Sequence, residues 1–577
     1  MPYKSKYHKK VAILENSLKI SELISYFNES PNNHFELGLV LNSRKELKGV
    51  INNVDIIKGI TNISKKNLLV EEIMNTSPIT IKNDLSPNEV IQEVKNKVSL
   101  RSKGVKNLTR YIPVINSKKQ VINIIDIYEL ISLQTIKNEN VEIYGLGFVG
   151  LSLAASLSNV GHNVTGIDIN KGLIEQLNKG EISIHEPGLS DLIKNLKLSN
   201  KINFYDKPPS KRNNFFIVCV GTPIDSRGNA NLKFIKSVLN IISKRIKKGD
   251  VVMLRSTVPV GTTRNIAKKI LEEKSNLQAG VDFYLSFAPE RTVEGKAMEE
   301  LKTLPQIVGG LTFKCTEIAG KFWRTHSNVV VQTNSLESAE LVKLANNSFR
   351  DLTFAFSNAL VLLADKYNID SNELIYLANE GYPRNSIARP SPGVGGYCLT
   401  KDPLLYAAID KSSPHAKLSR LGREINQELA KYPIKKFKSF VKEENLNLSE
   451  TNILIIGIAF KGWPETNDLR GSIGLEVAQE LRMICKNVDL YDSIISIEEV
   501  ESIGFKFKDI DSAESNNYDA VFIMNNHPKN IKKYFLRSLS KDNVFIFDGW
   551  NQIDKRTALG YKNIKYMNLG FYSGKVD

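Results

Sequence analysis

The sequence predicts an α/β protein in which two domains of alternating strands and helices flank a helical domain and follow a smaller α+β module. Short apolar runs separated by helix-like segments recur through residues 138–325 and again through 433–577. This alternation is typical of parallel sheets covered by helices. Residues 326–432 between them have helical periodicity. A chain of 577 residues has room for roughly three to five domains.

A glycine-rich turn near the start of the second block predicts a dinucleotide site. The apolar run 141–144 leads into Gly-x-Gly-x-x-Gly at 145–150, and a second apolar run, 163–167, ends at Asp168. Such glycines let the backbone approach a pyrophosphate. An acid about twenty residues further on binds the ribose hydroxyls of NAD and would repel the extra phosphate of NADP. The candidate NAD-binding residues are Gly145, Gly147, Phe148, Val149, Gly150 and Asp168.

Polar turns follow three further strand-like runs of the second block. They are the turns at 221–223, 255–262 and 288–295. Ligands of open α/β sheets bind at the carboxyl ends of the strands, so these turns predict a site. At other positions the same Ser and Thr residues would be interpreted as ordinary turn residues that bond to nearby backbone.

One cysteine lies in a setting that suits a nucleophile. Cys398 follows the glycine-rich segment 392–396 and stands where a helix could begin, and the helix dipole there would favour its thiolate. Asp402 comes four residues later and would share a face of that helix. An isolated cysteine is more often a buried packing residue, but this chain also supplies a hydride acceptor. The sequence therefore predicts Cys398 as a catalytic nucleophile.

Residues 338–347 predict a helix with three polar side chains on one face. Glu340, Lys343 and Asn347 recur at helical spacing. Two interpretations stay open. The face is either solvated, with a weak Glu–Lys pair, or it belongs to a long central helix that carries polar groups toward a cleft.

The last block, 433–577, predicts a second and degenerate nucleotide-binding fold. An apolar run at 452–456 leads into the glycine-containing turn 457–462, as in the first such fold. Further strand-like runs follow at 488–491, 520–524 and 544–547.

The first block, residues 1–137, contains a weak internal repeat, because residues 47–56 resemble 121–130. The pattern is similar to a tandem pair of cystathionine-β-synthase (CBS) domains, a module that often binds adenine nucleotides. The nucleotide-binding version has Thr or Ser before its Asp. The corresponding positions here hold Asn52 before Asp55 and Asp126 before Glu129. Binding of an adenine nucleotide and a structural or dimerising role remain two open interpretations.

Composition and charge argue against several other classes. The chain has 78 Lys and Arg against 62 Asp and Glu, a net charge of +16, but no aromatic-interleaved basic stripe that would suit nucleic acid. Its four scattered cysteines show neither metal-ligand spacing nor a disulfide framework. No apolar run reaches membrane-spanning length, and the first residues lack a signal-peptide core. We therefore expect a cytoplasmic protein with no metal, nucleic acid or membrane partner.

Residues 140–551, roughly three-quarters of the chain, resemble the UDP-glucose/GDP-mannose dehydrogenase family of NAD-dependent nucleotide-sugar 6-dehydrogenases. The resemblance implies a homodimer and two Rossmann-like domains, 138–325 for NAD and 433–577 for the UDP-sugar. The helical dimerisation domain between them, 326–432, would carry the catalytic cysteine, and the CBS-like pair is an addition. The matching segments, in the family's order, are 145–150, 185–189, 220–223, 256–263, 289–295, 340–347, 393–402 and 459–470.

The family oxidises a sugar's primary alcohol twice, giving a uronic acid and two NADH. By resemblance, Cys398 holds the intermediate aldehyde as a thiohemiacetal, which becomes a thioester that water cleaves. Lys343 would stabilise the developing oxyanion, and Asn347 would hydrogen-bond the same oxygen. Asp402 would orient water and tune Lys343.

Other matches imply supporting and binding roles. Glu290 would activate the water for hydrolysis, and Thr222 would position that water. Thr222 and Thr257 would also contact NAD, as would Arg470, which could equally form a surface ion pair. The residues placed with the nucleotide sugar are Glu290, Arg291, Glu294, Lys343, Asn347, Gly393, Gly395, Gly396 and Lys461.

Two positions favour an N-acetylated sugar. Arg291 follows Glu290, and Gly-Val-Gly-Gly precedes Tyr397. Both are more similar to the branch acting on UDP-N-acetylmannosamine (UDP-ManNAc) or UDP-N-acetylglucosamine (UDP-GlcNAc) than to UDP-glucose enzymes. Tyr397 stands where that branch commonly has His, and Arg291 could equally meet a substrate phosphate. UDP-glucose therefore stays an alternative.

A catalytically idle nucleotide-sugar sensor, signalling through the first block, is a second class. The intact set of Cys398, Lys343, Asn347 and Asp402 favours an enzyme, because a sensor would have no need of the thiol. As an enzyme, the protein would serve polysaccharide or other glycan biosynthesis.

Overall fold

The computed structural model describes residues 3–4, 11–29, 35–52, 55–57, 68–82, 93, 110–126, 139–225, 228–327, 329–510, 517–532 and 535–575. The chain forms two compact units, Met1–Lys137 and Asn138–Asp577. None of the helices within the described ranges is long and apolar enough to cross a membrane.

The first unit contains two small sheets that share a three-stranded topology, and β1 adds an antiparallel fourth strand to the first of them. In each sheet a parallel strand pair is followed by an antiparallel hairpin, and the hairpin register shifts between Val40 and Leu41 in one and between Val114 and Ile115 in the other. The predicted internal repeat is therefore confirmed. The elements are β1 (Tyr3–Lys4), β2 (Val11–Glu15), α1 (Ile20–Glu29), β3 (Leu37–Leu41) and β4 (Leu47–Ile51), then α3 (Val70–Ile73), β5 (Ile81–Lys82), β6 (Tyr111–Ile115) and β7 (Val121–Asp126).

An asparagine closes the turn of each hairpin. The side-chain oxygen of Asn42, like that of Asn116, accepts hydrogen bonds from the backbone N–H groups two and four residues later. The Leu47 N–H donates to the Lys119 carbonyl at 2.9 Å, which joins the two turns. The repeat thus extends to the side chains that fix each turn. Glu129 lies outside the described residues.

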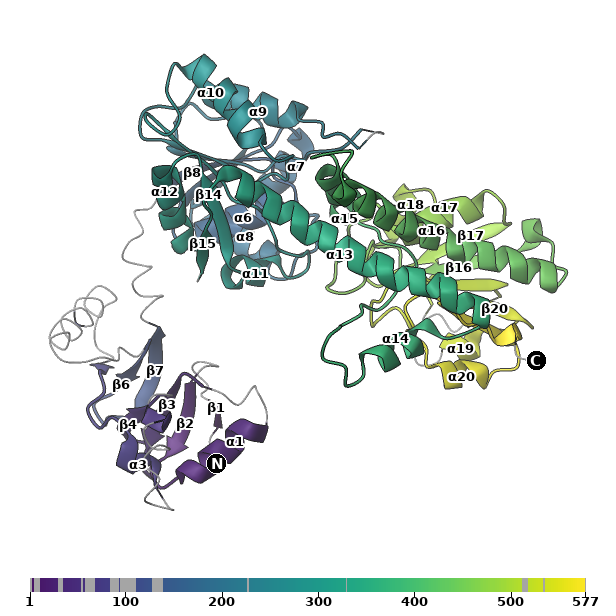
Figure 1. Ribbon diagram of the computed structural model, residues 1–577, viewed down its shortest axis with the longest axis horizontal. Helices are drawn as coiled ribbons and strands as arrows, with labels where there is room; N and C mark the ends of the chain where they lie inside the picture. Colours follow the sequence, from purple (N-terminus) through teal and green to yellow (C-terminus); the bar gives the residue numbers. More distant parts are fainter. Residues whose placement is uncertain are drawn as a thin grey trace. The chain divides into compact units, whose positions relative to one another are not determined.

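The second unit begins with an eight-stranded sheet in the order β10-β9-β8-β11-β12-β13-β14-β15 (Figure 1). Its first six strands are parallel and have the strand order of a dinucleotide-binding fold, and β14 runs antiparallel to β13. The strands are β8 (Asn140–Tyr144), β9 (Asn163–Ile167), β10 (Ile202–Tyr205), β11 (Phe215–Val218), β12 (Val251–Leu254), β13 (Tyr284–Phe287), β14 (Gln306–Gly310) and β15 (Val330–Gln332). The helices are α6 (Phe148–Asn159), α7 (Lys171–Lys179), α8 (Leu189–Leu198), α9 (Lys233–Ser243), a π-helix (Thr263–Ala267), α10 (Lys268–Ser275), α11 (Ala297–Thr303) and α12 (Phe313–Arg324).

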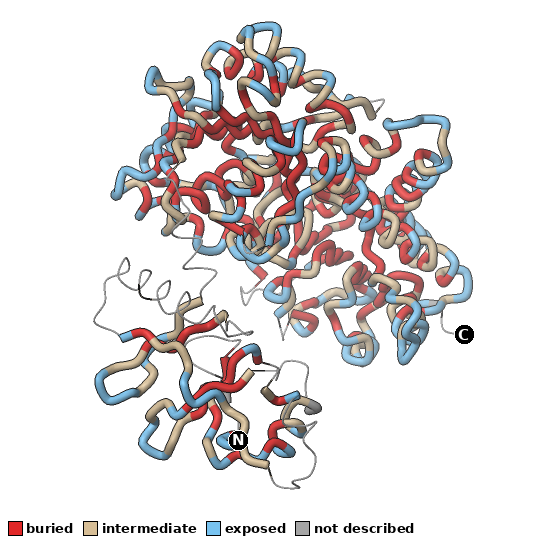
Figure 2. Tube along the Cα trace, turned by 60° about the vertical axis from the view of Figure 1, so that its left-hand side comes forward, coloured by how far each residue is buried: buried red, intermediate tan, exposed pale blue. Residues whose placement is uncertain are grey.

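The central strands β11 and β12 are buried at every residue, as expected where helices cover a parallel sheet on each side; buried residues are red in Figure 2. Successive strand residues point to opposite faces. Val141 and Ile143 of β8 therefore join one core cluster with Leu153 of α6, while Tyr144 joins the other. We call this sheet with its helices the first lobe.

Long helices connect the first lobe to a second sheet. The start of α13 packs in a core of the first lobe through Leu336, and its end packs against the second sheet through Val361 (Figure 1). A buried ion pair of 2.7 Å between Arg423 of α16 and Asp351 of α13 joins these two helices. The elements are α13 (Leu336–Ala364), a 3₁₀ turn (Asp365–Tyr367), α14 (Ser371–Asn379), α15 (Tyr397–Ala407) and α16 (Pro414–Glu443).

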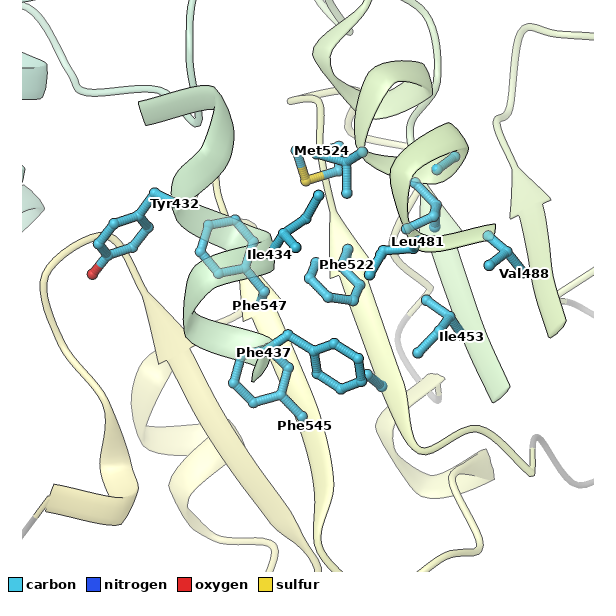
Figure 3. Close-up of a cluster of buried hydrophobic side chains, with 14 of the residues drawn as sticks. Tyr432, Ile434, Phe437, Ile453, Leu481, Val488, Phe522, Met524, Phe545 and Phe547 are labelled. Carbon is cyan, nitrogen blue, oxygen red and sulfur yellow. The ribbon is translucent and has the colours of Figure 1, made fainter. Parts of the chain in front are cut away.

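The second sheet is parallel throughout, in the order β18-β17-β16-β19-β20-β21. Phe437 of α16 packs against it, with its ring 5.6 Å from Phe522 and 5.7 Å from Phe545 (Figure 3). We call this sheet with its own helices the second lobe. Its elements are β16 (Asn452–Ile456), α17 (Ile473–Arg482), β17 (Asn487–Tyr491), α18 (Ile497–Ser502), β18 (Lys506–Phe507), β19 (Ala520–Ile523), α19 (Phe535–Ser538), β20 (Val544–Asp548), α20 (Lys555–Leu559) and β21 (Ile564–Asn568); short 3₁₀ turns are Leu448–Glu450 and Ser573–Lys575.

Two predicted domain boundaries fall inside continuous structure. The boundary between 432 and 433 lies within α16, because Pro433 does not end that helix and its last turns pack in the second lobe. A proline removes one helical hydrogen bond, and apolar packing here outweighs that loss. β15 lies beyond the predicted boundary at 325, yet it pairs with β14 of the first sheet.

Candidate active site

The turn between β8 and α6 leaves space beside its backbone. Gly145 has a φ of +93°, a Cβ on Gly150 would overlap the Gly145 carbonyl oxygen, and a Cβ on Gly147 would have nothing within 4 Å. Asp168, at the end of β9, accepts the Leu146 N–H at 2.8 Å and holds the turn against that strand. An open backbone at a helix N-terminus is a site for phosphate groups, so this turn fits the pyrophosphate of NAD. Phe148 and Val149 form the first turn of α6.

The polar turns after β11 and β12 are bonded to each other at the same edge of the sheet. The buried Thr222 hydroxyl donates to the Thr257 carbonyl at 2.6 Å, and the Ser256 hydroxyl donates to the Val220 carbonyl at 2.6 Å. The structure therefore brings Thr222 and Thr257 together.

One face of α13 carries three buried polar residues into the site. Glu340 accepts hydrogen bonds from the Gly261 N–H at 2.5 Å, the Thr263 N–H at 2.8 Å and the Thr263 hydroxyl at 2.6 Å, and burial raises the pKa of its carboxyl. Lys343 and Asn347 are buried on the same face. The interpretation as a solvated face with a Glu–Lys pair is wrong, because Glu340 holds the 261–263 turn instead.

Cys398 is the second residue of α15 and is exposed. The surrounding protein nevertheless raises the pKa of its thiol by desolvation; the charges of Lys343 and Lys401 oppose this, while those of Asp402 and Glu294 add to it.

Asp402 is fully buried and accepts two hydrogen bonds. Asn347 Nδ2 donates to one oxygen at 2.6 Å and Lys401 Nζ to the other at 2.6 Å. Asp402 was expected to tune Lys343, but the cation bonded to Asp402 is Lys401 and not Lys343. Sequence reasoning missed Lys401, because adjacent residues on a helix ordinarily face different ways.

Glu290 is held by Arg255, a second residue that the sequence did not reveal. The buried Arg255 donates from Nε and Nη2 to one oxygen of Glu290, and the backbone N–H groups of Arg291 and Thr292 donate to the other, each at 2.7 Å. Burial alone would raise the pKa of Glu290, but Arg255 and the Thr292 N–H bring it below its usual value. Glu290 is thus an ionised carboxylate whose oxygens already accept four hydrogen bonds.

Glu294 and Lys461 meet where the two lobes touch. The Thr466 hydroxyl donates to Glu294 at 2.9 Å, and Lys461 Nζ donates to the Glu294 backbone carbonyl at 2.5 Å. Desolvation, and next the charge of Asp468, raises the pKa of Glu294, and burial lowers the pKa of Lys461 to about 8. The structure therefore gathers the predicted residues of the 288–295 and 459–470 motifs.

Residues 461–470, here called the interlobe segment, join the lobes by further contacts. The two oxygens of Glu465 lie 3.1 Å from His185 Nε2 of the first lobe and 3.2 Å from His527 Nε2 of the second. Asn467 Nδ2 donates to the Ser183 carbonyl at 2.9 Å. Close packing also requires Gly295, since a Cβ there would overlap the Glu465 carbonyl oxygen.

The glycines before Cys398 are needed for packing against protein. A Cβ on Gly393, where φ is +94°, would lie 3.0 Å from Ala430, and one on Gly395 would overlap the Gly471 carbonyl oxygen. A Cβ on Gly396 would lie 2.7 Å from the Phe460 ring. The loop is thereby pressed between α16 and the second lobe, which places the start of α15 at their junction.

The side chains of two predicted binding residues, Arg291 and Arg470, are bonded to other protein groups. Arg291 donates from its side chain to the Pro305 carbonyl, which directs it toward the 305 turn rather than Cys398. Arg470 bonds Asp468 at 2.6 Å and lies 5.0 Å from the centroid of the Tyr397 ring. Across the described part of the chain, no group of His, Cys, Asp and Glu side chains could hold a metal ion.

The fold and these side chains define an NAD-dependent dehydrogenase with a second nucleotide-binding lobe and a cysteine at the lobe junction. Residues 139–327 match the NAD-binding domain of the UDP-glucose/GDP-mannose dehydrogenase family, 337–428 match its central domain, and 454–555 match its UDP-binding domain. The chain belongs to the UDP-glucose/GDP-mannose dehydrogenase family. Residues 70–135 match a CBS domain.

Several similar proteins are named UDP-N-acetyl-D-mannosamine dehydrogenase. The UDP-N-acetyl-D-mannosamine dehydrogenase of Pyrococcus horikoshii is 32% identical over 429 residues, 73% of this chain and 97% of that protein. The enzyme of that name from Campylobacter jejuni is 36% identical over 347 residues, 59% of this chain and 82% of that protein. A solved structure of UDP-D-ManNAc dehydrogenase from Pyrococcus horikoshii, 30% identical, covers 75% of this chain and 99% of its own with a TM-score of 0.67.

These matches confirm the predicted family, the two Rossmann-like folds with an N-terminal CBS domain, and the NAD cofactor. The chain is an NAD-dependent oxidoreductase with a UDP-binding domain for a nucleotide-sugar substrate.

Proposed function

We propose that this chain oxidises the C6 hydroxymethyl group of a UDP-N-acetylhexosamine, UDP-ManNAc or UDP-GlcNAc, to the uronate. The observation that carries the proposal is the gathering of Cys398, Lys343, Asn347 and Asp402 where α13 and α15 pack together. The relatives named UDP-N-acetyl-D-mannosamine dehydrogenase support the N-acetylated sugar. In this proposal the first lobe holds NAD at the 145–150 turn, and the second lobe holds the UDP group near Lys461.

The cysteine performs the central step. Removal of the hydroxyl proton and of a hydride from C6 gives an aldehyde, to which the Cys398 thiolate adds. Lys343 and Asn347 stabilise the oxyanion that forms. Loss of a second hydride from the same carbon leaves a thioester on Sγ, and water cleaves it to the uronate and free thiol. Bound NAD supplies the hydride acceptor, so two NAD are reduced for each sugar.

Thr222 and Glu290 act on the hydrolytic water in this proposal, with Glu294 in support. The pair with Arg255 keeps Glu290 ionised, but Glu290 must release one of its four hydrogen bonds to accept a proton. We expect Glu290→Gln to release a burst of two NADH per site and to accumulate a thioester on Cys398, measured by intact-mass spectrometry. The same accumulation in Glu294→Gln, and not in Glu290→Gln, would assign the base to Glu294.

NADH release from a panel of nucleotide sugars tests the function. We expect two NADH for each UDP-ManNAc or UDP-GlcNAc consumed, and a lower kcat/KM with UDP-glucose and GDP-mannose. A higher kcat/KM with UDP-glucose would support the UDP-glucose alternative. Tight binding of a UDP-sugar without any NADH release would support the sensor.

We infer a homodimer formed through the helical domain. Phe349, Phe356 and Leu363 recur every seven residues along α13 and are exposed, and Leu418 and Leu421 of α16 are exposed as well. Large apolar side chains gathered on one pair of helices are typical of a protein interface. Light scattering should show a dimer that the double change F349E and F356E converts to a monomer. Leu198→Glu, an exposed change at the end of α8, should leave the dimer intact.

An adenine nucleotide at the N-terminal module is a separate proposal, supported by the CBS match and the repeated topology. Arg110 Nη2 lies 2.7 Å from Asp126, and the Asn52 and Asp55 side chains each accept the other residue's backbone N–H. A ribose approaching Asp126 would compete with Arg110. Calorimetry with ATP, AMP and S-adenosylmethionine tests this proposal. The absence of a binding signal with all three would favour a structural role.

We also propose a cytoplasmic location. All four cysteines are free thiols, and the proposed chemistry needs Cys398 reduced. Reducing compartments maintain that state. Fractionation of cells that produce the protein tests the location.

A further inference from the structure

Lys343 is a buried cation whose nearby carboxylates are all engaged by other groups. Asp402 is bonded by Lys401 and Asn347. Glu290 is bonded by Arg255, Glu340 by the 261–263 turn and Glu294 by Thr466. Within the described residues, Lys343 itself has no hydrogen bond or ion pair. A lysine on a crowded polar face would ordinarily be expected to take one of these carboxylates as its partner.

Lys401 is placed to prevent the most direct of these pairings. It is buried beside Asp402 on α15, with Nζ 2.6 Å from one Asp402 oxygen and 5.2 Å from the centroid of the Tyr397 ring. The ring and the carboxylate hold the ammonium group between them. Asn347 bonds the other Asp402 oxygen, so each oxygen already has a donor, and the Lys401 ammonium balances the charge that would otherwise attract Lys343.

We propose that Lys401 is a positioning residue: by occupying Asp402, it keeps Lys343 without a carboxylate partner, so that the charge of Lys343 acts on the sulfur of Cys398 and on the oxyanion formed there. This inference rests on the proposed function for the role of the oxyanion. Its electrostatic part concerns the thiol of the free protein, and can therefore be tested without any sugar.

The charges around Cys398 set what a change at Lys401 should do. Loss of the Lys401 cation would leave Asp402 as an unpaired buried anion, free to pair with Lys343. Both effects make the thiolate harder to form, because one cation is removed and a second is neutralised. The charged groups acting on the thiol are Lys343 of α13, Lys401 and Asp402 of α15, Glu294 of the 288–295 turn and Arg470 of the interlobe segment.

The pH dependence of alkylation at Cys398 measures this effect directly. Iodoacetamide would be applied to the full chain without ligands, and the modified peptide would be quantified by mass spectrometry, which separates Cys398 from Cys219, Cys315 and Cys485. We expect Lys401→Met to raise the apparent pKa of Cys398 by about one unit. Lys401→Arg keeps the charge and should stay near the wild-type value, as should the remote, exposed Lys411→Met.

The double variant K401M/D402N tests whether the change in the pKa of Cys398 comes from the freed Asp402 carboxylate or from lost packing at position 401. Removing the carboxylate with its cation should bring the apparent pKa back toward the wild-type value. An unchanged pKa in Lys401→Met, or a pKa in the double variant as high as in the single one, would overturn the inference. If Lys401→Met fails to fold, Lys401→Gln replaces it, because its amide can still donate to Asp402 without a charge and should also raise the pKa. Absence of NADH release from any nucleotide sugar would count against the proposed function alone.

Discussion

Cys398 combines an exposed position with a thiol whose pKa the surrounding protein raises. Lys343 and Lys401 act in the opposite direction, so their charges decide how much thiolate is available near neutral pH. In the proposed mechanism, the first hydride transfer from the sugar gives the aldehyde to which that thiolate adds.

At Cys398 itself we expect Cys398→Ser to abolish uronate formation while NAD still binds. A hydroxyl with a far higher pKa cannot form the covalent intermediate at a useful rate, so turnover should fall by at least about a thousandfold. NAD affinity, measured by fluorescence titration, should be unchanged, because the 145–150 turn lies in the first lobe. Uronate production at the wild-type rate by this variant would refute the assigned nucleophile. Cys485→Ser, a change at a partly buried cysteine that packs against the second lobe's core, is a matched control.

The protonation state of Lys461 should control how the rate with the UDP-sugar depends on pH. Burial lowers its pKa to about 8, so its ammonium is charged below that pH and loses its proton above it. If the cation binds the UDP group, kcat/KM for the UDP-sugar should fall about tenfold per pH unit above pH 8. Lys461→Arg should remove this decline, because a guanidinium stays charged. Persistence of the decline in that variant would assign it to another group; the exposed Lys486→Arg should keep it.

The sequence indicated the reacting residues but not the cations that control them. Cys398, Lys343, Asn347 and Asp402 could be predicted, because a glycine-rich approach and helical spacing mark them. Arg255 and Lys401 could not, since their roles depend on partners that only the folded structure reveals. Arg255 follows β12 and bonds Glu290, which follows β13. Lys401 bonds Asp402, the next residue on the same helix. Buried charges of this kind need a partner, but spacing alone does not identify it.

At the scale of elements, α13 links the 261–263 turn of the first lobe to α15, the helix that carries Cys398. Glu340 near its start anchors the 261–263 turn, while Asn347 two turns later bonds Asp402 of α15. A shift of this helix would therefore move both ends of the site together.

We expect Glu340→Ala to lower the free energy of unfolding of the first lobe by about 3 kcal/mol, because three donors lose a buried charged acceptor. The KM for NAD should rise as well, since the anchored turn continues from Thr257. Calorimetry and initial-rate kinetics measure the two effects. Glu337→Ala removes only a partly exposed pair with Arg264 one turn earlier and should cost at most about 1 kcal/mol. Equal losses in both variants would contradict the anchoring role.

Elements with an apolar strand pattern were the most predictable. The run 452–456 is β16, which is apolar and buried from 453 to 456 as expected of a strand covered on both faces. The run 163–167 is β9, which is buried at Val164, Gly166 and Ile167. The end of the helical domain was not predictable from Pro433. Apolar residues beyond it, such as Phe437, pack into the second lobe and continue α16 across the expected boundary.

At the scale of the whole second unit, closure of the two lobes depends on the interlobe segment. It carries Lys461 and Arg470 and touches the first lobe through Glu294, Gly295 and His185. A site built from residues of both lobes is complete only while this segment stays docked.

Glu465 tests that dependence, because its two oxygens contact a histidine from each lobe. We expect Glu465→Ala to speed amide hydrogen exchange in residues 461–470 and also in the 183–186 loop, since each segment loses its partner in the other lobe. The KM for the UDP-sugar should rise, whereas Glu450→Ala, an exposed change in the same lobe, should alter neither measurement. Glu465→Gln keeps one acceptor and should be intermediate. Faster exchange confined to the second lobe would mean that the other contacts of the interlobe segment hold the lobes together, and that Glu465 serves only to fix His527.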